Sequence, residues 1–109
     1  MPYHLIQAAN PAFIEESQYG IAAQVTFSPI NSCILIAASV GNGNVVGIHL
    51  VMIQSDTWFT PADVNVVTGT LAALSAVPGT TIVFGQTFLW AATQPVQAGY
   101  GALIAALAP

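Results

Sequence analysis

The strongest constraint on how this chain can fold is a pair of predominantly apolar runs on either side of a short turn sequence. The runs cover residues 33–40 and 45–53, and Gly41-Asn42-Gly43-Asn44 separates them. An Asn-Gly pair favours a two-residue hairpin turn, because both of its positions tolerate positive φ. Apolar strands without polar alternation belong in a sheet that is covered on both faces. The sequence therefore predicts a central β-hairpin inside a layered fold.

The segment before the hairpin predicts a helix followed by a strand. Asn10 can cap a helix over residues 10–19, Pro11 suits its first turn and Gly20 can end it. Residues 21–27 then alternate apolar and polar side chains, which is the pattern of a half-buried strand.

The segment after the hairpin predicts helix, strand and helix. Thr60 can cap a helix over residues 60–74, and Asp63 completes a capping box with it. Residues 80–90 favour a strand, and helical apolar spacing returns from Gln94.

The 109 residues suit one domain spanning residues 1–109. From the order of elements we expect an α/β (α+β) layered sandwich. Its sheet should be mixed or mostly antiparallel, with four or more strands and helices packed on it.

The complete absence of lysine and arginine restricts the partners of the chain. The formal net charge is −4, with acidic residues at only four positions. Proteins that bind nucleic acids use lysine and arginine to displace counterions from phosphates, so we expect no nucleic-acid partner. Charged residues are 4 % of the chain and apolar residues 55 %, and low charge weakens the repulsion between copies. We therefore expect a homo-oligomer.

The apolar stretch over residues 33–53 is long enough to span a bilayer, but a turn sequence and His49 interrupt it. Lipid does not tolerate such a turn, so we expect no membrane span. The first residues, Met1 to His4, lack the cationic and apolar regions of a secretory signal. A single cysteine cannot form an internal disulfide. We expect a cytoplasmic, reducing compartment, although secretion by a non-classical route stays open.

Cys33 and His49 are the most promising chemical pair, since a cysteine nucleophile needs a base close to it in space. With a plain two-residue turn, Cys33 would pair with Met52 and His49 with Ile36, on opposite faces of the sheet. A single bulge in the Cys33 strand would instead place Cys33 opposite Val51, with His49 diagonal to it on the same face. The catalytic interpretation therefore requires a bulge or a longer turn.

The remaining titratable residues have simpler explanations. Glu15 and Glu16 are adjacent and fit a solvated helix face, Asp63 fits a helix cap, and Asp56 fits a turn. The two histidines are far apart and have no patterned ligand partners, so we expect no metal and no cofactor.

The segment Ile30-Asn31-Ser32-Cys33, followed by an apolar strand, a turn and His49, resembles the core of the cysteine glutamine deamidases. These families include the chemotaxis receptor deamidases (CheD) and the deamidating toxins of the cytotoxic necrotizing factor group. In them, a Gly/Ser-rich tetrapeptide ends in the nucleophilic cysteine, and the histidine follows on the next strand. The resemblance covers roughly residues 21–90.

The resemblance implies a thiol hydrolase in which Cys33 attacks the side-chain carboxamide of a protein glutamine and His49 is the base. It implies a third catalytic residue at Thr26, or alternatively Ser28, because Phe27 occupies the position where the receptor deamidases have threonine. Backbone amides near Ser32 would stabilise the oxyanion. The histidine would lower the pKa of the thiol, and Cys33 would then alkylate rapidly.

Two other interpretations fit the same residues. In the first, Cys33 and His49 are core residues of a non-enzymatic homo-oligomeric assembly domain. In the second, the aromatic side chains near the end of the chain line an apolar-ligand pocket; these are Phe84, Phe88, Trp90 and Tyr100. An exposed Cys33 within about 4 Å of His49 would favour the enzyme, and a sealed Cys33 the assembly domain.

Overall fold

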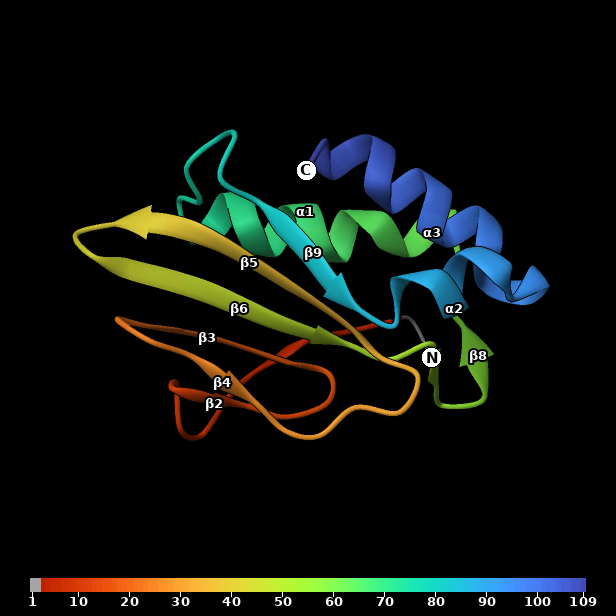
Figure 1. Ribbon diagram of the computed structural model, residues 1–109, viewed down its shortest axis with the longest axis horizontal. Coiled ribbons are helices and arrows are strands. Elements are labelled where there is room, and N and C mark those ends of the chain that lie inside the picture. Colours follow the sequence, from red (N-terminus) through yellow and green to blue (C-terminus); the bar gives the residue numbers. More distant parts are fainter. Residues whose placement is uncertain (1–2) are drawn as a thin grey trace.

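The centre of the protein is a five-stranded sheet with helices packed on one face (Figure 1). The computed structural model describes residues 3–109, so Met1 and Pro2 of the N-terminal segment lie outside the described residues. In spatial order the strands are β1 (Ile6–Gln7), β3 (Gln18–Ala22), β6 (Asn44–Leu50), β5 (Ile34–Gly41) and β9 (Ile82–Gly85). β1 pairs with β3 in parallel and the other pairs are antiparallel. The prediction of an α+β sandwich with a mixed sheet is confirmed.

The predicted hairpin is formed by β5 and β6, and its turn has the expected geometry. Asn42 and Gly43 both have positive φ, at 54° and 77°. Gly41 pairs with Asn44, but the next pair is Ser39 with Val45, which leaves Val40 as an extra residue in β5. This is a β-bulge in the strand that follows Cys33. The Gly41 N–H donates a hydrogen bond to the Ser39 hydroxyl at 3.3 Å, which stabilises the bulged backbone.

A helical layer covers one face of the sheet. It contains a short 3₁₀ turn η1 (Pro61–Asp63), α1 (Val64–Ala73), α2 (Thr87–Ala92) and α3 (Gln94–Leu107). The predicted capping box is present, and the Asp63 carboxylate accepts a hydrogen bond from the Thr60 N–H at 2.8 Å. Alternate residues of β5 and β6 face the helices and form the main core with them; the buried strand residues are Ile34, Ile36, Ala38, Val46, Ile48 and Leu50.

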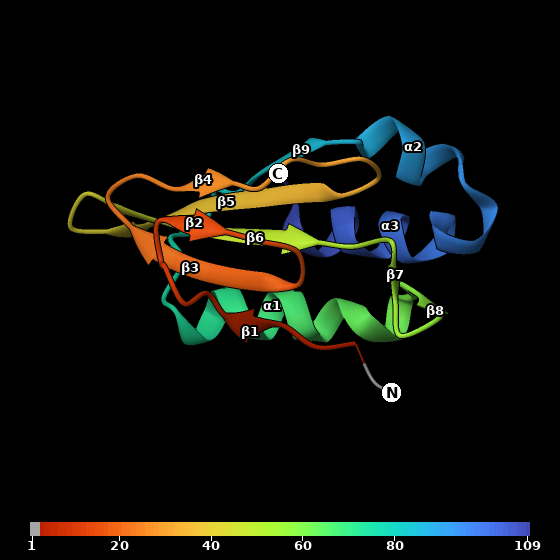
Figure 2. The ribbon, with the colours of Figure 1, turned by 90° about the horizontal axis from the view of Figure 1, so that it is seen from below.

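A two-stranded parallel ribbon covers the opposite face of the sheet (Figures 1 and 2). It consists of β2 (Phe13–Ile14) and β4 (Thr26–Phe27). The ribbon lies close to β6, because a Cβ added at Gly47 would stand only 2.9 Å from the Phe27 ring. His49, on the same face of β6 as Gly47, is therefore enclosed between the sheet and this ribbon.

The predicted helix over residues 10–19 is wrong. The segment holds β2 and the start of β3 instead. The Asn10 side chain accepts a hydrogen bond from the Ala12 N–H at 3.0 Å and forms a local turn rather than a helix cap. Gly20 lies within β3, where a Cβ would meet the Pro11 carbonyl oxygen at 2.6 Å. This glycine permits close packing of the ribbon rather than ending a helix.

Three other predicted segments differ in extent. The strand over residues 21–27 is broken between β3 and β4, and the strand over residues 80–90 ends at Gly85 and gives way to α2. The run over residues 45–53 leaves the sheet after Leu50 and enters a small hairpin of β7 (Ile53–Gln54) and β8 (Thr57–Trp58). The predicted C-terminal helix is confirmed as α3. Within residues 3–109, no helix is long and apolar enough to cross a membrane.

Candidate functional site

The bulge at Val40 brings Cys33 and His49 onto the same face of the sheet. Beyond the bulge, Leu35 pairs with His49 and Ile34 with Leu50, so Cys33 lies opposite Val51. This is the register that the catalytic interpretation requires. Cys33 and His49 are diagonal neighbours on the face that the β2–β4 ribbon covers.

The imidazole of His49 is fully buried, and its tautomer is fixed by a backbone carbonyl. Its Nδ1 lies 3.2 Å from the Ile14 carbonyl oxygen. A carbonyl can only accept, so Nδ1 must carry the hydrogen and Nε2 keeps a free lone pair. Nε2 is buried and has no hydrogen-bond partner among residues 3–109. The ring is therefore oriented to act as a base or a metal ligand through Nε2.

The residue beside the histidine is Ser28 and not Thr26. The Ser28 hydroxyl lies 3.4 Å from Nδ1 of His49, and the backbone N–H of Ser28 donates to the Ile14 carbonyl at 3.0 Å. The Thr26 side chain is exposed on β4. Between them, the Phe27 ring packs edge-on against the imidazole, with the ring centroids 6.1 Å apart. The structure therefore brings Ser28 to the candidate site and leaves Thr26 on the surface.

Cys33 is held firmly and is almost covered, with 2 % of its surface exposed. The Gln86 N–H donates to the Cys33 carbonyl at 3.0 Å, and Nε1 of Trp90 donates to the preceding carbonyl, that of Ser32, at 2.6 Å. The thiol donates to the Glu16 carboxylate at 3.5 Å. Burial and then the charge and hydrogen bond of Glu16 raise the pKa of the Cys33 thiol to about 12. The expectation of a lowered thiol pKa is wrong for this resting arrangement.

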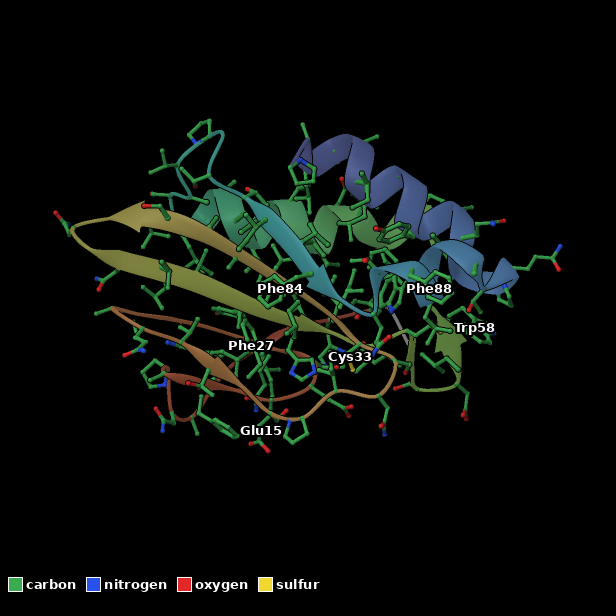
Figure 3. The ribbon with its side chains drawn as sticks, in the orientation of Figure 1. Glu15, Phe27, Cys33, Trp58, Phe84 and Phe88 are labelled. Carbon is green, nitrogen blue, oxygen red and sulfur yellow. The ribbon has the colours of Figure 1, made fainter. Side chains whose placement is uncertain are left out.

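Glu16 is the site residue that sequence reasoning missed. It occupies a tight turn in which the Gln18 N–H donates to the Glu15 carbonyl at 3.1 Å. Ser17 has a φ of 63°, unusual for serine, and its N–H donates to the His49 carbonyl at 2.9 Å. The turn is thus fastened to β6 beside the histidine. Figure 3 shows Glu15 on the outer surface, well away from Cys33.

Glu16, Cys33 and His49 form a compact cluster. One carboxylate oxygen, the sulfur and one ring nitrogen all lie within 4.8 Å of one another. A pocket of about 160 Å³ borders the cluster, and its lining residues are Glu16, Ser32, Cys33, Val51, Met52 and Ile53. Cys33 lines this pocket but is buried, so the exposed cysteine that would favour the enzyme is not observed.

The four aromatic residues considered for an apolar-ligand pocket occupy different environments. Trp90 is fully buried and packs against Tyr100, with the ring centroids 6.3 Å apart. Phe84 packs edge-on against Phe27 at 5.8 Å, and 80 % of the Phe88 surface is exposed (Figure 3). Core packing and surface exposure account for these side chains.

Comparison with known proteins adds no assignment. No family model matches the chain, and no curated protein or solved structure does so either.

Proposed function

We propose that this chain is a thiol hydrolase of the glutamine deamidase type, with Cys33 as nucleophile and His49 as base. The observation that carries the proposal is the bulge in β5, which puts both side chains on one face, with a ring nitrogen within 4.8 Å of the sulfur. The Ile14 carbonyl keeps Nε2 as the basic nitrogen. Cysteine hydrolases commonly combine a nucleophile with a base that a third group orients.

The reaction proceeds in two steps. Nε2 of His49 takes the thiol proton, and the sulfur of Cys33 attacks the carboxamide carbon of a glutamine side chain. The C–N bond breaks, ammonia leaves with the proton from His49, and a thioester remains. His49 then takes a proton from water, whose oxygen attacks the thioester. The C–S bond breaks, the product is a carboxylic acid, and Cys33 regains its proton.

Glu16 supports a preference for a carboxamide substrate. Its carboxylate can accept a hydrogen bond from the –NH₂ group of a carboxamide, which a carboxylate substrate cannot offer. The chain has no lysine or arginine to offset the charge of Glu16, so the acidic product is repelled from the pocket once His49 is neutral again. Backbone amides near Ser32 and Cys33 are left to stabilise the oxyanion, because no lysine or arginine exists to do so.

The test uses a blocked Gln-Gly dipeptide and glutamine-rich casein as substrates, with a chelator present. We expect ammonia release from at least one of them, and a thioester that hydroxylamine traps as a hydroxamate. Cys33→Ser should abolish both signals. His49→Gln should lower the rate at least about 100-fold, which is the usual contribution of a general base.

Two matched controls keep the result specific. His4→Gln removes the other histidine, which is exposed, and Glu15→Gln removes the carboxylate next to Glu16. Both variants should keep the wild-type rate. Ammonia release that survives in Cys33→Ser, or its absence with both substrates, would contradict the proposal.

A specific observation also favours the assembly domain as a second candidate. His49 is fully buried and Cys33 nearly so, as core residues are. At the same time, β9 and α2 leave three large apolar side chains exposed, namely Ile82, Phe84 and Phe88. An assembly domain would self-associate through such a surface. It would show no thiol-dependent turnover, so the same assay separates the two candidates.

A further inference from the structure

Three donor groups from separate parts of the chain meet beside the pocket. Glu16 comes from the turn before β3, Cys33 directly precedes β5, and His49 lies in β6. A carboxylate oxygen, a thiolate sulfur and an imidazole nitrogen are the donor types that zinc binds in proteins. The cluster thus has the composition of a three-ligand zinc site.

The distances suit a single ion. Zinc–ligand bonds of about 2.0–2.3 Å in a tetrahedron put neighbouring donor atoms roughly 3.3–3.6 Å apart. The sulfur of Cys33 and the carboxylate oxygen of Glu16 are already 3.5 Å apart, and all three donors lie within 4.8 Å of one another. Glu16 is on an exposed turn, so its side chain can make the remaining adjustment.

The surroundings of His49 match those of a metal ligand. Histidines that bind zinc usually donate their second N–H to a carboxylate, a backbone carbonyl or a water, and Nδ1 of His49 donates to the Ile14 carbonyl. Nε2 is then left buried without any partner among residues 3–109. A buried polar atom without a partner is rare in folded proteins, and a bound ion is one of its recognised explanations.

The charges of the cluster also favour a bound cation. A Cys33 thiolate beside the Glu16 carboxylate would place two negative charges together, and the chain contains no lysine or arginine to balance them. A divalent cation would balance both charges. It would displace the thiol proton to solvent as the metal–sulfur bond forms.

We propose that Glu16, Cys33 and His49 bind one divalent ion of the zinc type, with the fourth coordination position toward the 160 Å³ pocket. The sequence predicts no metal site because its two histidines are far apart, whereas this cluster needs only one histidine together with Cys33 and Glu16. The inference does not depend on the hydrolase. If both hold, the ion inhibits the hydrolase, because a metal-bound thiolate is withheld from attack.

The test is a titration of the chelator-stripped, reduced full-length chain with Co²⁺, followed by Zn²⁺. We expect one equivalent of Co²⁺ to give a thiolate-to-cobalt absorption band in the near ultraviolet, which Zn²⁺ then removes. Cys33→Ser should lose this band. Glu16→Gln and His49→Gln should weaken Co²⁺ binding about 100-fold or more. Loss of a residue that only supports a metal ligand already costs up to about 100-fold in affinity, and these two residues are ligands themselves.

Glu15→Gln and His4→Gln are the matched controls and should bind as the wild type does. Glu16→Gln changes an exposed turn residue, so it tests the site even if the buried variants fail to fold. Absence of the thiolate band at saturating Co²⁺, or equal affinity of Glu16→Gln and Glu15→Gln, would overturn the proposal.

The outcome can be separated from that of the hydrolase assay, which is run with a chelator. Zinc binding without turnover supports the metal site and overturns the hydrolase alone. Once the chelator has been removed, turnover that one equivalent of Zn²⁺ leaves unchanged overturns the metal site alone. Turnover that Zn²⁺ inhibits in the wild type, and inhibits far less in Glu16→Gln, supports both.

Discussion

At the scale of single residues, the reactivity of Cys33 depends on Glu16. Because burial and Glu16 raise the pKa of the thiol to about 12, little thiolate exists at neutral pH. In metal-free protein, we expect slow alkylation by iodoacetamide that keeps accelerating above about pH 8.5, where an ordinary cysteine is already half ionised. Glu16→Gln removes the charge and the acceptor, so it should lower the pKa and speed alkylation at neutral pH.

The measurement is the alkylation rate of Cys33 across this pH range, followed by mass spectrometry. Glu15→Gln is the control, because its carboxylate lies on the outer surface, and it should leave the profile unchanged. A wild-type rate that levels off near neutral pH would show that Glu16 does not hold the proton on the thiol.

Some of the candidate site could be predicted from the sequence and some could not. Cys33 and His49 stand out because few other side chains in this sequence can act as a nucleophile or a base. The alternation of side chains along a strand then shows that the pair needs a bulge to share one face. Ile14 contributes a carbonyl, which no side-chain identity encodes. Glu16 reaches the thiol because it lies in a turn in which Ser17 has a φ of 63°. Serine rarely adopts this conformation, so the sequence gives no sign of the turn.

At the scale of elements, the elements with local sequence signals were predicted correctly, whereas the elements that depend on non-local strand pairing were not. The hairpin carries an Asn-Gly turn and the helix after it carries a capping box, so both follow from neighbouring residues. Within residues 10–27, the five-residue β3 pairs with β1 and β6, whereas β2 and β4 are two-residue strands that pair in parallel with each other. Strands of that length have no periodicity to detect, so the cap and stop signals of a helix were misleading there.

Replacing either of two glycines of α3 by alanine should change the free energy of unfolding, but in opposite directions. A Cβ at Gly99 would lie 2.6 Å from the Phe59 carbonyl oxygen, whereas at Gly101 no heavy atom of the described residues lies within 4 Å. Gly99→Ala should therefore lower the free energy of unfolding by about 1–3 kcal/mol through overpacking. Gly101→Ala should raise it by up to about 1 kcal/mol, because alanine favours helix.

Urea denaturation of the two variants beside the wild type measures both changes. The comparison is internally controlled, since the substitution and the helix are the same. Equal effects of the two substitutions would mean that α3 does not pack against Phe59 as described.

At the scale of the whole molecule, we expect self-association. Strand β9 is an edge strand of the sheet among residues 3–109; its Ile82 is 56 % exposed, and Phe88 of the following helix α2 is 80 % exposed. A net charge of −4 gives little repulsion between copies. Light scattering at micromolar concentration should detect an oligomer that Phe88→Gln weakens. Ile6→Gln, on the opposite edge, is the control, and a wild-type monomer would contradict the expectation.

The extra residue Val40 has a consequence for how this hairpin can change in length. Side chains alternate between the faces of a strand, so one residue inserted or deleted within the paired part of β5 or β6 between Cys33 and His49 would separate them onto opposite faces. Two residues, one added to each strand, would keep them together. Chains that share this site should therefore differ by even numbers in the length of the paired strands of this hairpin, an evolutionary signature that sequencing of homologues can reveal.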